Sequence, residues 1–162
     1  SLINLLMGFS SSNYKGKIVF NLLNEKEDEK YISFIDGNPF ILANSLFENI
    51  TLGKKYSREL FEKVVYCSYL DDIVKEKGID SSPYFNGNLT LSQGQCQRVG
   101  LARVLLTQSD IVCLDEIFSG IDTKVVRIIL KRIKEIFPKT IFIIVGHQDF
   151  LTEISDNVLE IL

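Results

Sequence analysis

Cysteine and long apolar runs are both scarce in this sequence of 162 residues. Its three cysteines, Cys67, Cys96 and Cys113, are odd in number and lack the spacing of metal ligands, which excludes a disulfide framework and suits a reducing compartment. The longest apolar runs, residues 2–8 and 141–146, are too short to cross a bilayer, so no transmembrane helix is predicted. The first run has neither a basic leader nor a small-residue cleavage site, which argues against a signal peptide.

An excess of positive charge is missing as well. The sequence has 18 Lys and Arg residues against 21 Asp and Glu residues, a net charge of −3. Because proteins that bind nucleic acid usually present a basic surface, we expect no nucleic-acid partner. Apolar residues make up 46% of the chain and charged residues 24%, which is close to the globular average. The length and the composition together predict a single folded domain.

The hydrophobic pattern predicts an α/β domain. Apolar residues at helical spacing predict helices at 2–8, 45–50, 69–77, 93–107 and 123–137. Leu60, Val64 and Val65 form an amphipathic stripe that predicts a further helix after the N-cap Ser57. Short runs of apolar residues predict strands at 17–20, 31–35, 111–114, 141–145 and 157–162. Continuously apolar strands that are separated by helices indicate a mostly parallel sheet with right-handed crossovers. The helical stretch at about 38–92 is predicted to be a small α-helical subdomain inserted into a core of residues 1–37 and 93–162.

Polar side chains follow the two most apolar strands. Asp115 and Glu116 come directly after one strand, and His147 follows the other. Because the carboxyl ends of parallel strands meet at one edge, these three side chains are expected at a common ligand-binding edge. Asp115 suits Mg²⁺, and Glu116 suits the polarisation of an attacking water. Each of these residues also has a purely structural interpretation. Asp115 and Glu116 could form an ordinary acidic turn, and His147 could be structural or solvated. Asp122 could simply cap the helix that follows it.

The segment Leu91-Ser92-Gln93-Gly94-Gln95 opens the helix that leads to the first of these strands. A glycine lets a ligand approach the backbone closely, and a hydroxyl at a helix N-terminus suits a phosphate group. An ordinary N-cap at Ser92 explains the same residues equally well.

Several motifs in order resemble those of ATP-binding-cassette (ABC) ATPases. Residues 91–103 resemble the family's signature motif, and residues 111–116 resemble its Walker B strand with the catalytic glutamate. Residues 119–122 resemble the D-loop, and residues 145–147 resemble the segment that carries the switch histidine. Residues 38–40 and 46–50 are most similar to the exporter-type branch, so the resemblance covers most of the chain.

The resemblance implies a fold, a reaction and partners. The fold would be a P-loop NTPase (RecA-like) core, and the reaction would be ATP hydrolysis with Mg²⁺ at a head-to-tail dimer of two nucleotide-binding domains. A transmembrane domain would be the second partner, which implies a place at the cytoplasmic face of a membrane. The implied roles are catalysis for Glu116 and His147, Mg²⁺ binding for Asp115, coupling across the dimer for Asp122, and contact with the partner's ATP for Leu91, Ser92, Gln93, Gly94 and Gln95.

The sequence also departs from the family pattern. No Gly-x-x-x-x-Gly-Lys-Ser/Thr, the phosphate-binding Walker A loop, occurs in it, and Ser1 would fall at or just beyond the end of that loop. We therefore expect the chain to begin just after its P-loop, without the N-terminal β part of the fold. Gly37 occupies the place of the Q-loop glutamine. Gln93 stands where the signature motif most commonly has glycine. Ile117 stands directly after the catalytic glutamate, where a small residue or proline is usual.

Two alternatives to a transporter ATPase follow from these departures. One is a non-catalytic fragment or interaction module that binds no ATP alone because the P-loop is absent. The other is an ABC ATPase outside transport, such as a DNA-repair or translation factor. The short interval before the signature, without heptads, argues against the chromosome-organising relatives, and the negative net charge argues more weakly against translation factors.

Overall fold

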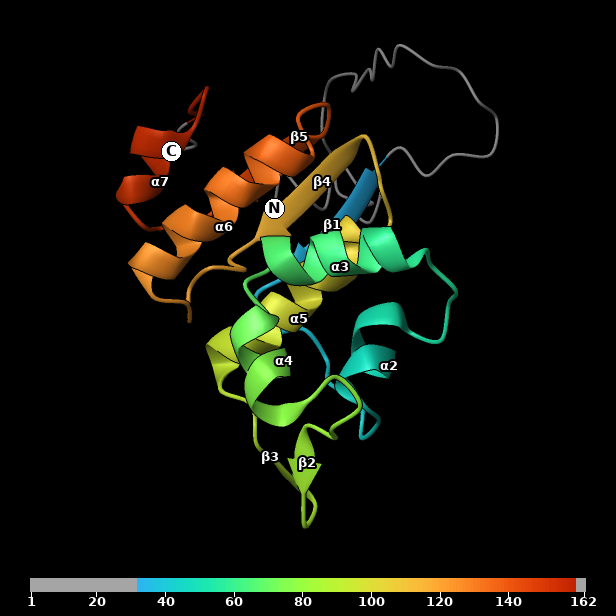
Figure 1. The fold of residues 1–162 in the computed structure, drawn as a ribbon. Coiled ribbons are helices and arrows are strands. Elements are labelled where there is room, and N and C mark those ends of the chain that lie inside the picture. Colours follow the sequence, from blue (N-terminus) through green and yellow to red (C-terminus); the bar gives the residue numbers. More distant parts are fainter. Residues whose placement is uncertain (1–31, 160–162) are drawn as a thin grey trace, which may run out of the picture.

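A computed structural model describes residues 32–159, and Figure 1 shows their arrangement. The strands are β1 (Ile32–Asp36), β2 (Tyr84–Phe85), β3 (Asn88–Leu89), β4 (Ile111–Asp115) and β5 (Ile141–Val145). The helices are α2 (Leu46–Thr51), α3 (Arg58–Cys67), α4 (Asp71–Lys77), α5 (Gln93–Leu105), α6 (Thr123–Ile136) and α7 (Phe150–Ile154). The helix predicted at 2–8 and the strand predicted at 17–20 lie outside the described residues.

The described part of the sheet has three strands in the order β1-β4-β5, all parallel. Asp115 pairs in register with Asp36 on one side and with Val145 on the other. The carboxyl ends of the three strands therefore end level at one edge, and the segments that follow them meet there. The predicted parallel α/β sheet is confirmed.

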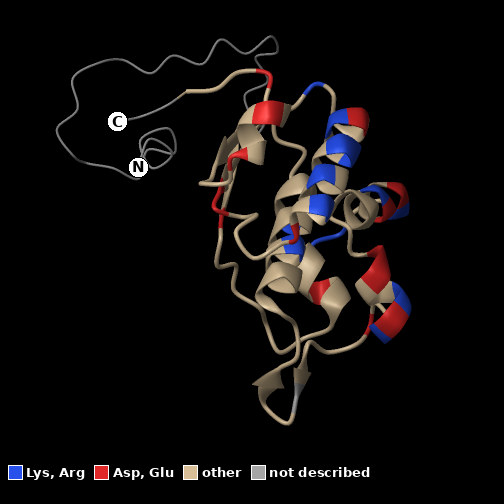
Figure 2. Cartoon of the chain, turned by 90° about the vertical axis from the view of Figure 1, so that its left-hand side faces the viewer, with Lys and Arg blue, Asp and Glu red and all other residues tan. Residues whose placement is uncertain are grey.

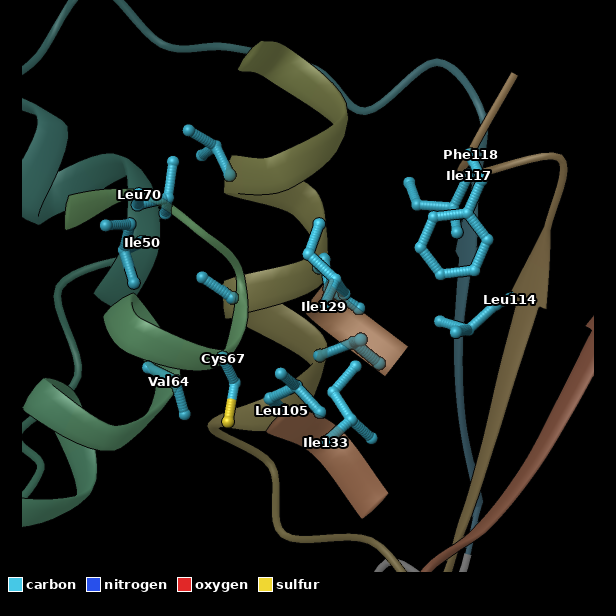
Figure 3. Close-up of a cluster of buried hydrophobic side chains, with 14 of the residues drawn as sticks. Ile50, Val64, Cys67, Leu70, Leu105, Leu114, Ile117, Phe118, Ile129 and Ile133 are labelled. Atoms are coloured by element: carbon cyan, nitrogen blue, oxygen red, sulfur yellow. The ribbon is translucent and has the colours of Figure 1, made fainter. Parts of the chain in front are cut away.

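The helix α5 lies at the centre of the molecule. Figure 3 shows buried side chains from α2, α3 and α6 around it, together with Leu114 of β4. Most of α5 is enclosed on all sides, since eleven of its thirteen residues are buried. A buried helix needs small residues where other segments cross it: a Cβ on Gly100 would lie 2.8 Å from the Cβ of Pro39. The segment after β1 is therefore packed directly on α5.

The helix starts follow the capping residues that the sequence indicates. The side chain of Ser45 accepts a hydrogen bond from the Glu48 N–H, and the Glu48 carboxylate completes a capping box. Ser57 caps α3 in the same manner. These caps satisfy N–H groups that would otherwise lack partners at the helix starts.

Several elements differ from those predicted. The sequence predicted only a turn where the structure has the short hairpin β2–β3. Asn86 and Gly87 both have positive φ, as the tight turn of this hairpin requires. Helix α7 was not predicted, because its five residues are too few for a periodic pattern. Residues 157–159 of the predicted last strand form no strand; residues 160–162 lie outside the described part. The subdomain boundaries proposed for residues 38–92 stay a prediction.

Figure 2 shows where the charged residues lie on the outer helices, and α6 carries basic residues along its length. Three of the five basic residues of α6 have a carboxylate partner: Arg127 with Glu153, Arg132 with Asp71, and Lys134 with Asp156. Such exposed pairs contribute little stability each, about 0–1 kcal/mol. Lys124 and Lys131 have no carboxylate partner among residues 32–159, so the pairs offset only part of the positive charge of α6.

Candidate functional site

The three side chains expected at the strand-end edge are adjacent in the structure. The Glu116 N–H donates a hydrogen bond of 2.9 Å to the carbonyl of Val145, which continues the β4–β5 ladder by one residue. Beyond it, His147 Nε2 lies 3.0 Å from Glu116 Oε1. The glutamate is 33% exposed and the histidine 93%, so the pair sits at the surface of the edge, where a ligand can reach both groups.

The backbone at Glu116 is unusual. Its φ is +54°, a left-handed conformation that a non-glycine residue adopts only when its surroundings hold it there. Gly37, at the end of β1, is packed against this residue: a Cβ on Gly37 would lie 2.7 Å from the Glu116 carbonyl oxygen. A glutamine at position 37 would therefore require the backbone to move. The sequence indicates only that a glutamine side chain is absent at position 37. It does not indicate that glycine is needed there for the close approach to the Glu116 carbonyl.

Asp115 is suited to a divalent cation. Its carboxylate lies at the carboxyl end of β4, half-buried, and accepts no hydrogen bond from the residues that the structure describes. A carboxylate oxygen of this kind is a ligand that Mg²⁺ accepts, and Mg²⁺ commonly takes its remaining ligands from water and phosphates. Within residues 32–159, no cluster of three or more His, Cys, Asp or Glu side chains could hold a metal alone. The Asp115 carboxylate thus fits Mg²⁺ as one ligand.

The signature-like segment forms the start of α5. Ser92 is the N-cap: its hydroxyl accepts a hydrogen bond from the Gln95 N–H at 3.2 Å, and the Gln95 side chain accepts one from the Ser92 N–H at 2.9 Å. The N-cap interpretation is therefore confirmed, and it does not conflict with phosphate contact. Ser92 and Gln93 are exposed, so the helix N-terminus remains accessible to an anion.

A pocket of about 200 Å³ lies beside this helix start. Its lining comes from the signature-like segment, the D-loop-like segment, the first turn of α6, helix α4 and the turn between α3 and α4. The residues are Tyr69, Asp72, Ser92, Gly94, Gln95, Arg98, Gly120, Ile121, Asp122 and Val125. Asp122 is at once part of this lining and the N-cap of α6, accepting a hydrogen bond of 2.8 Å from the Lys124 N–H. The simple-cap alternative for Asp122 is thus realised, while its exposed position leaves a contact with a partner open.

The predicted site residues therefore fall into two groups. Asp115, Glu116, His147 and the Gly37 backbone share the strand-end edge. Ser92, Gly94 and Gln95 line the pocket with Asp122, while Leu91 and Gln93 belong to the same segment but not to the lining. Among residues 32–159, the two groups are joined through Gln97, which the sequence analysis did not single out. No local pattern marks it in the sequence, where its neighbours are Cys96 and Arg98.

A glycine at position 94 is required by the packing of these segments. A Cβ there would lie less than 3.0 Å from the Gly120 carbonyl oxygen, a backbone atom that cannot rotate away. We expect Gly94→Ala to destabilise the fold by about 1–3 kcal/mol through overpacking, and to increase hydrogen exchange at residues 119–122. Gly53→Ala is the matched control, because it introduces strain at φ +74° with nothing within 4 Å. Equal exchange at residues 119–122 in both variants would contradict this contact.

The three cysteines take no part in the site. All are buried and free, as the absence of a disulfide framework predicted. Burial raises the pKa of Cys67 to about 12 and also raises the pKa of Cys96 and of Cys113. A thiol of raised pKa stays protonated and unreactive at neutral pH.

The chain is similar to known proteins in sequence and in fold. The family model described as "ABC transporter" matches residues 1–119. The multidrug resistance-like ATP-binding protein MdlB of Buchnera aphidicola subsp. Schizaphis graminum is 34% identical over 155 residues, 91% of this chain and 26% of that protein. The transport/processing ATP-binding protein MesD of Leuconostoc mesenteroides is 30% identical over 98% of this chain and 23% of its own length. The chain thus spans about a quarter of the length of these curated relatives.

A solved structure shares the fold. A bacterial Atm1-family ABC exporter with ATP bound aligns with a TM-score of 0.66, at 24% identity, over 73% of this chain and 21% of that one. The parallel sheet, the buried central helix and the acidic strand end define part of a P-loop NTPase α/β domain. The chain belongs to the ABC transporter family, as an exporter-like ATP-binding domain. No helix within residues 32–159 is long and apolar enough to span a bilayer.

Proposed function

We propose that this chain is part of the ATP-hydrolysing domain of an ABC exporter. The single observation that carries the proposal is the contact at the strand-end edge. There Glu116, which directly follows Asp115, has its Oε1 atom 3.0 Å from Nε2 of His147. A carboxylate there can orient or deprotonate the attacking water, and the imidazole can contact the terminal phosphate of ATP. Phosphoryl transfer depends mainly on such positioning and on charge stabilisation.

Asp115 would hold Mg²⁺, which neutralises charge on the phosphates when it is bound. The carboxylate has no hydrogen-bond partner within the described part of the chain, which leaves it available for this task. Glu116 is placed differently. Its side chain is only one-third exposed and is paired with His147, so we assign it to the reacting phosphate as a catalytic group and not to the metal as a further ligand.

The second half of the proposal concerns the dimer. The exposed start of α5 offers Ser92, the N–H groups of the first turn and the positive end of the helix to an anion. This surface is separate from the strand-end edge of the same chain. We infer that it covers the ATP held by a second nucleotide-binding domain, in a head-to-tail dimer, with Asp122 at the junction. A transmembrane domain would convert dimer closure and opening into transport, at the cytoplasmic face of the membrane.

The non-catalytic alternative rests on a specific observation as well. These 162 residues contain no Gly-x-x-x-x-Gly-Lys-Ser/Thr, the loop whose N–H groups and lysine hold the β- and γ-phosphates in these enzymes. On this alternative the chain folds but binds no nucleotide. A Gly-x-x-x-x-Gly-Lys-Ser/Thr upstream of Ser1 would support the proposed function, and a native start at or near Met7 would support this alternative.

A titration separates what this segment does alone from what the protein does. We expect the 162-residue chain to bind Mg-ATP with a Kd no tighter than millimolar, because it contributes Asp115 but no phosphate cradle. Calorimetry on a sample whose folding is checked by circular dichroism would measure this. Micromolar, Mg²⁺-dependent binding would contradict the expectation and would require phosphate ligands among residues other than those named above.

A further inference from the structure

Gln97 is a buried polar side chain at the junction of the two groups of site residues. It lies on α5 and is fully inaccessible to solvent. Its Nε2 donates to the Gly37 carbonyl at 2.9 Å and to Ser119 Oγ at 3.0 Å, and its Oε1 accepts from the Gly120 N–H at 2.9 Å. One amide group thus joins three segments that are far apart in the sequence.

The partners of Gln97 surround Glu116. Gly37 is packed against the Glu116 carbonyl, and the Ser119 N–H donates to that same carbonyl at 3.2 Å. Gly120 ends the tight turn that begins at Glu116. The glutamate holds a left-handed conformation, which persists only where neighbouring contacts determine it. The amide of Gln97 fixes the positions of both groups that contact the Glu116 carbonyl, so it acts on the catalytic residue through them.

The same side chain connects this turn to the start of α5. Gln97 follows Gly94 by three residues, so both lie on the helix face that packs on Gly120. A displacement of the start of α5 would therefore also move the turn at residues 116–120, because the buried Gln97 amide is hydrogen-bonded to that turn. Three of the four hydrogen-bonding positions of that amide are occupied, which leaves little freedom to rearrange.

We propose that Gln97 is a positioning residue that holds Glu116 for hydrolysis and ties it to the signature segment. This inference rests on the proposed function. Ligand contact at Ser92 and Gly94, on one side of α5, then sets the orientation of Glu116 at the other site of the same chain. A buried glutamine that only stabilises the fold would not produce this effect: its loss would lower stability and leave turnover by the folded protein unchanged.

Steady-state ATP hydrolysis by the full-length protein with Gln97→Met tests the proposal. Methionine keeps the size of the side chain and removes all three hydrogen bonds. We expect kcat to fall about tenfold or more while KM for ATP changes less than about twofold, because a displaced catalytic group affects the reaction more than binding. Thr51→Val is the matched control: it removes a buried hydroxyl that donates to the Phe47 carbonyl at 3.0 Å, and kcat should not change.

A double-variant measurement separates positioning from general loosening. Ser119→Ala alone removes one of the three contacts of Gln97 and should lower kcat about threefold. Added to Gln97→Met, it should have no further effect, because the contact is already lost. If Gln97→Met fails to fold, Ser119→Ala alone still decides, since Ser119 is exposed and its loss is tolerated.

The outcomes are distinguishable. A folded Gln97→Met protein with kcat within twofold of the wild type overturns the positioning role, as does an effect of Thr51→Val of the same size. Unchanged kcat in Ser119→Ala also overturns it. A wild-type protein with no ATPase activity overturns the proposed function and, with it, this inference.

Discussion

Glu116→Gln is expected to reduce ATP hydrolysis by the full-length protein by about 10²- to 10⁴-fold, the range that a general base contributes. Glutamine keeps the size of the side chain but can neither accept a proton nor attract a developing hydronium charge. The contact with His147 Nε2 at 3.0 Å can be kept by the amide oxygen, so the geometry of the edge should survive. The loss would therefore appear in kcat and not in the affinity for ATP.

The measurement is a phosphate-release assay at saturating ATP, with nucleotide affinity determined separately. Glu135→Gln is the matched control, because it is the same chemical change at an exposed position of α6. That variant should keep wild-type kcat. Turnover by Glu116→Gln within threefold of the wild type would remove Glu116 from its assigned role, whatever the role of the neighbouring Asp115.

The elements that could be predicted from sequence are those with strong local signals. The strands β4 and β5 are uninterrupted apolar runs, and the polar residues that follow them predict the strand-end edge. The N-caps at Ser57 and Ser92 follow from local chemistry in the same manner, whereas Ser45, predicted as the first residue of its helix, is the N-cap. Since parallel strands end at a common edge, the meeting of Glu116 with His147 followed from the strand assignment alone.

What could not be predicted depends on contacts between distant segments. The demand for glycine at positions 37 and 94 arises because the carbonyls of Glu116 and Gly120 approach them, and these approaches have no signal in a local window. Gln97 was missed for the same reason: its three partners lie 60, 22 and 23 residues away in sequence. The site edge is thus readable from sequence, while the packing that holds it in place is not.

Arg103→Met is expected to lower the free energy of unfolding by about 2–4 kcal/mol, the largest stability effect that we predict. Arg103 is buried on α5 and donates to three oxygens on the segment that follows β1: the carbonyls of Phe40 and Asn49 and the side-chain oxygen of Asn49. Methionine fills the same space but leaves all three oxygens without this donor. The guanidinium also lies 4.5 Å from the centre of the Phe40 ring, and that contact would be lost too.

The expected loss of stability is limited because burying the charged Arg103 side chain costs desolvation energy. Its hydrogen-bond partners within residues 32–159 include no carboxylate, and burial lowers its pKa to about 10, which still leaves it charged at neutral pH. Removing a buried charge regains part of its desolvation energy. The carbonyl oxygens of Phe40 and Asn49 lose this donor, and that loss outweighs the gain, at roughly 1–3 kcal/mol each before relaxation and water entry. The side-chain oxygen of Asn49 keeps its hydrogen bond from the Leu42 N–H at 2.8 Å.

Urea unfolding of the purified protein, followed by circular dichroism, measures the effect as a shift of the midpoint at constant slope. Arg58→Met is the matched control: its side chain is 92% exposed and pairs only with Glu62 four residues on, so its removal should shift the midpoint far less. Equal midpoints for the two variants would show that Arg103 does not hold the segment after β1 on α5. A large shift of the urea midpoint for Arg103→Met, and not for Arg58→Met, would show that the hydrogen bonds of Arg103 are the main polar contacts between α2 and α5.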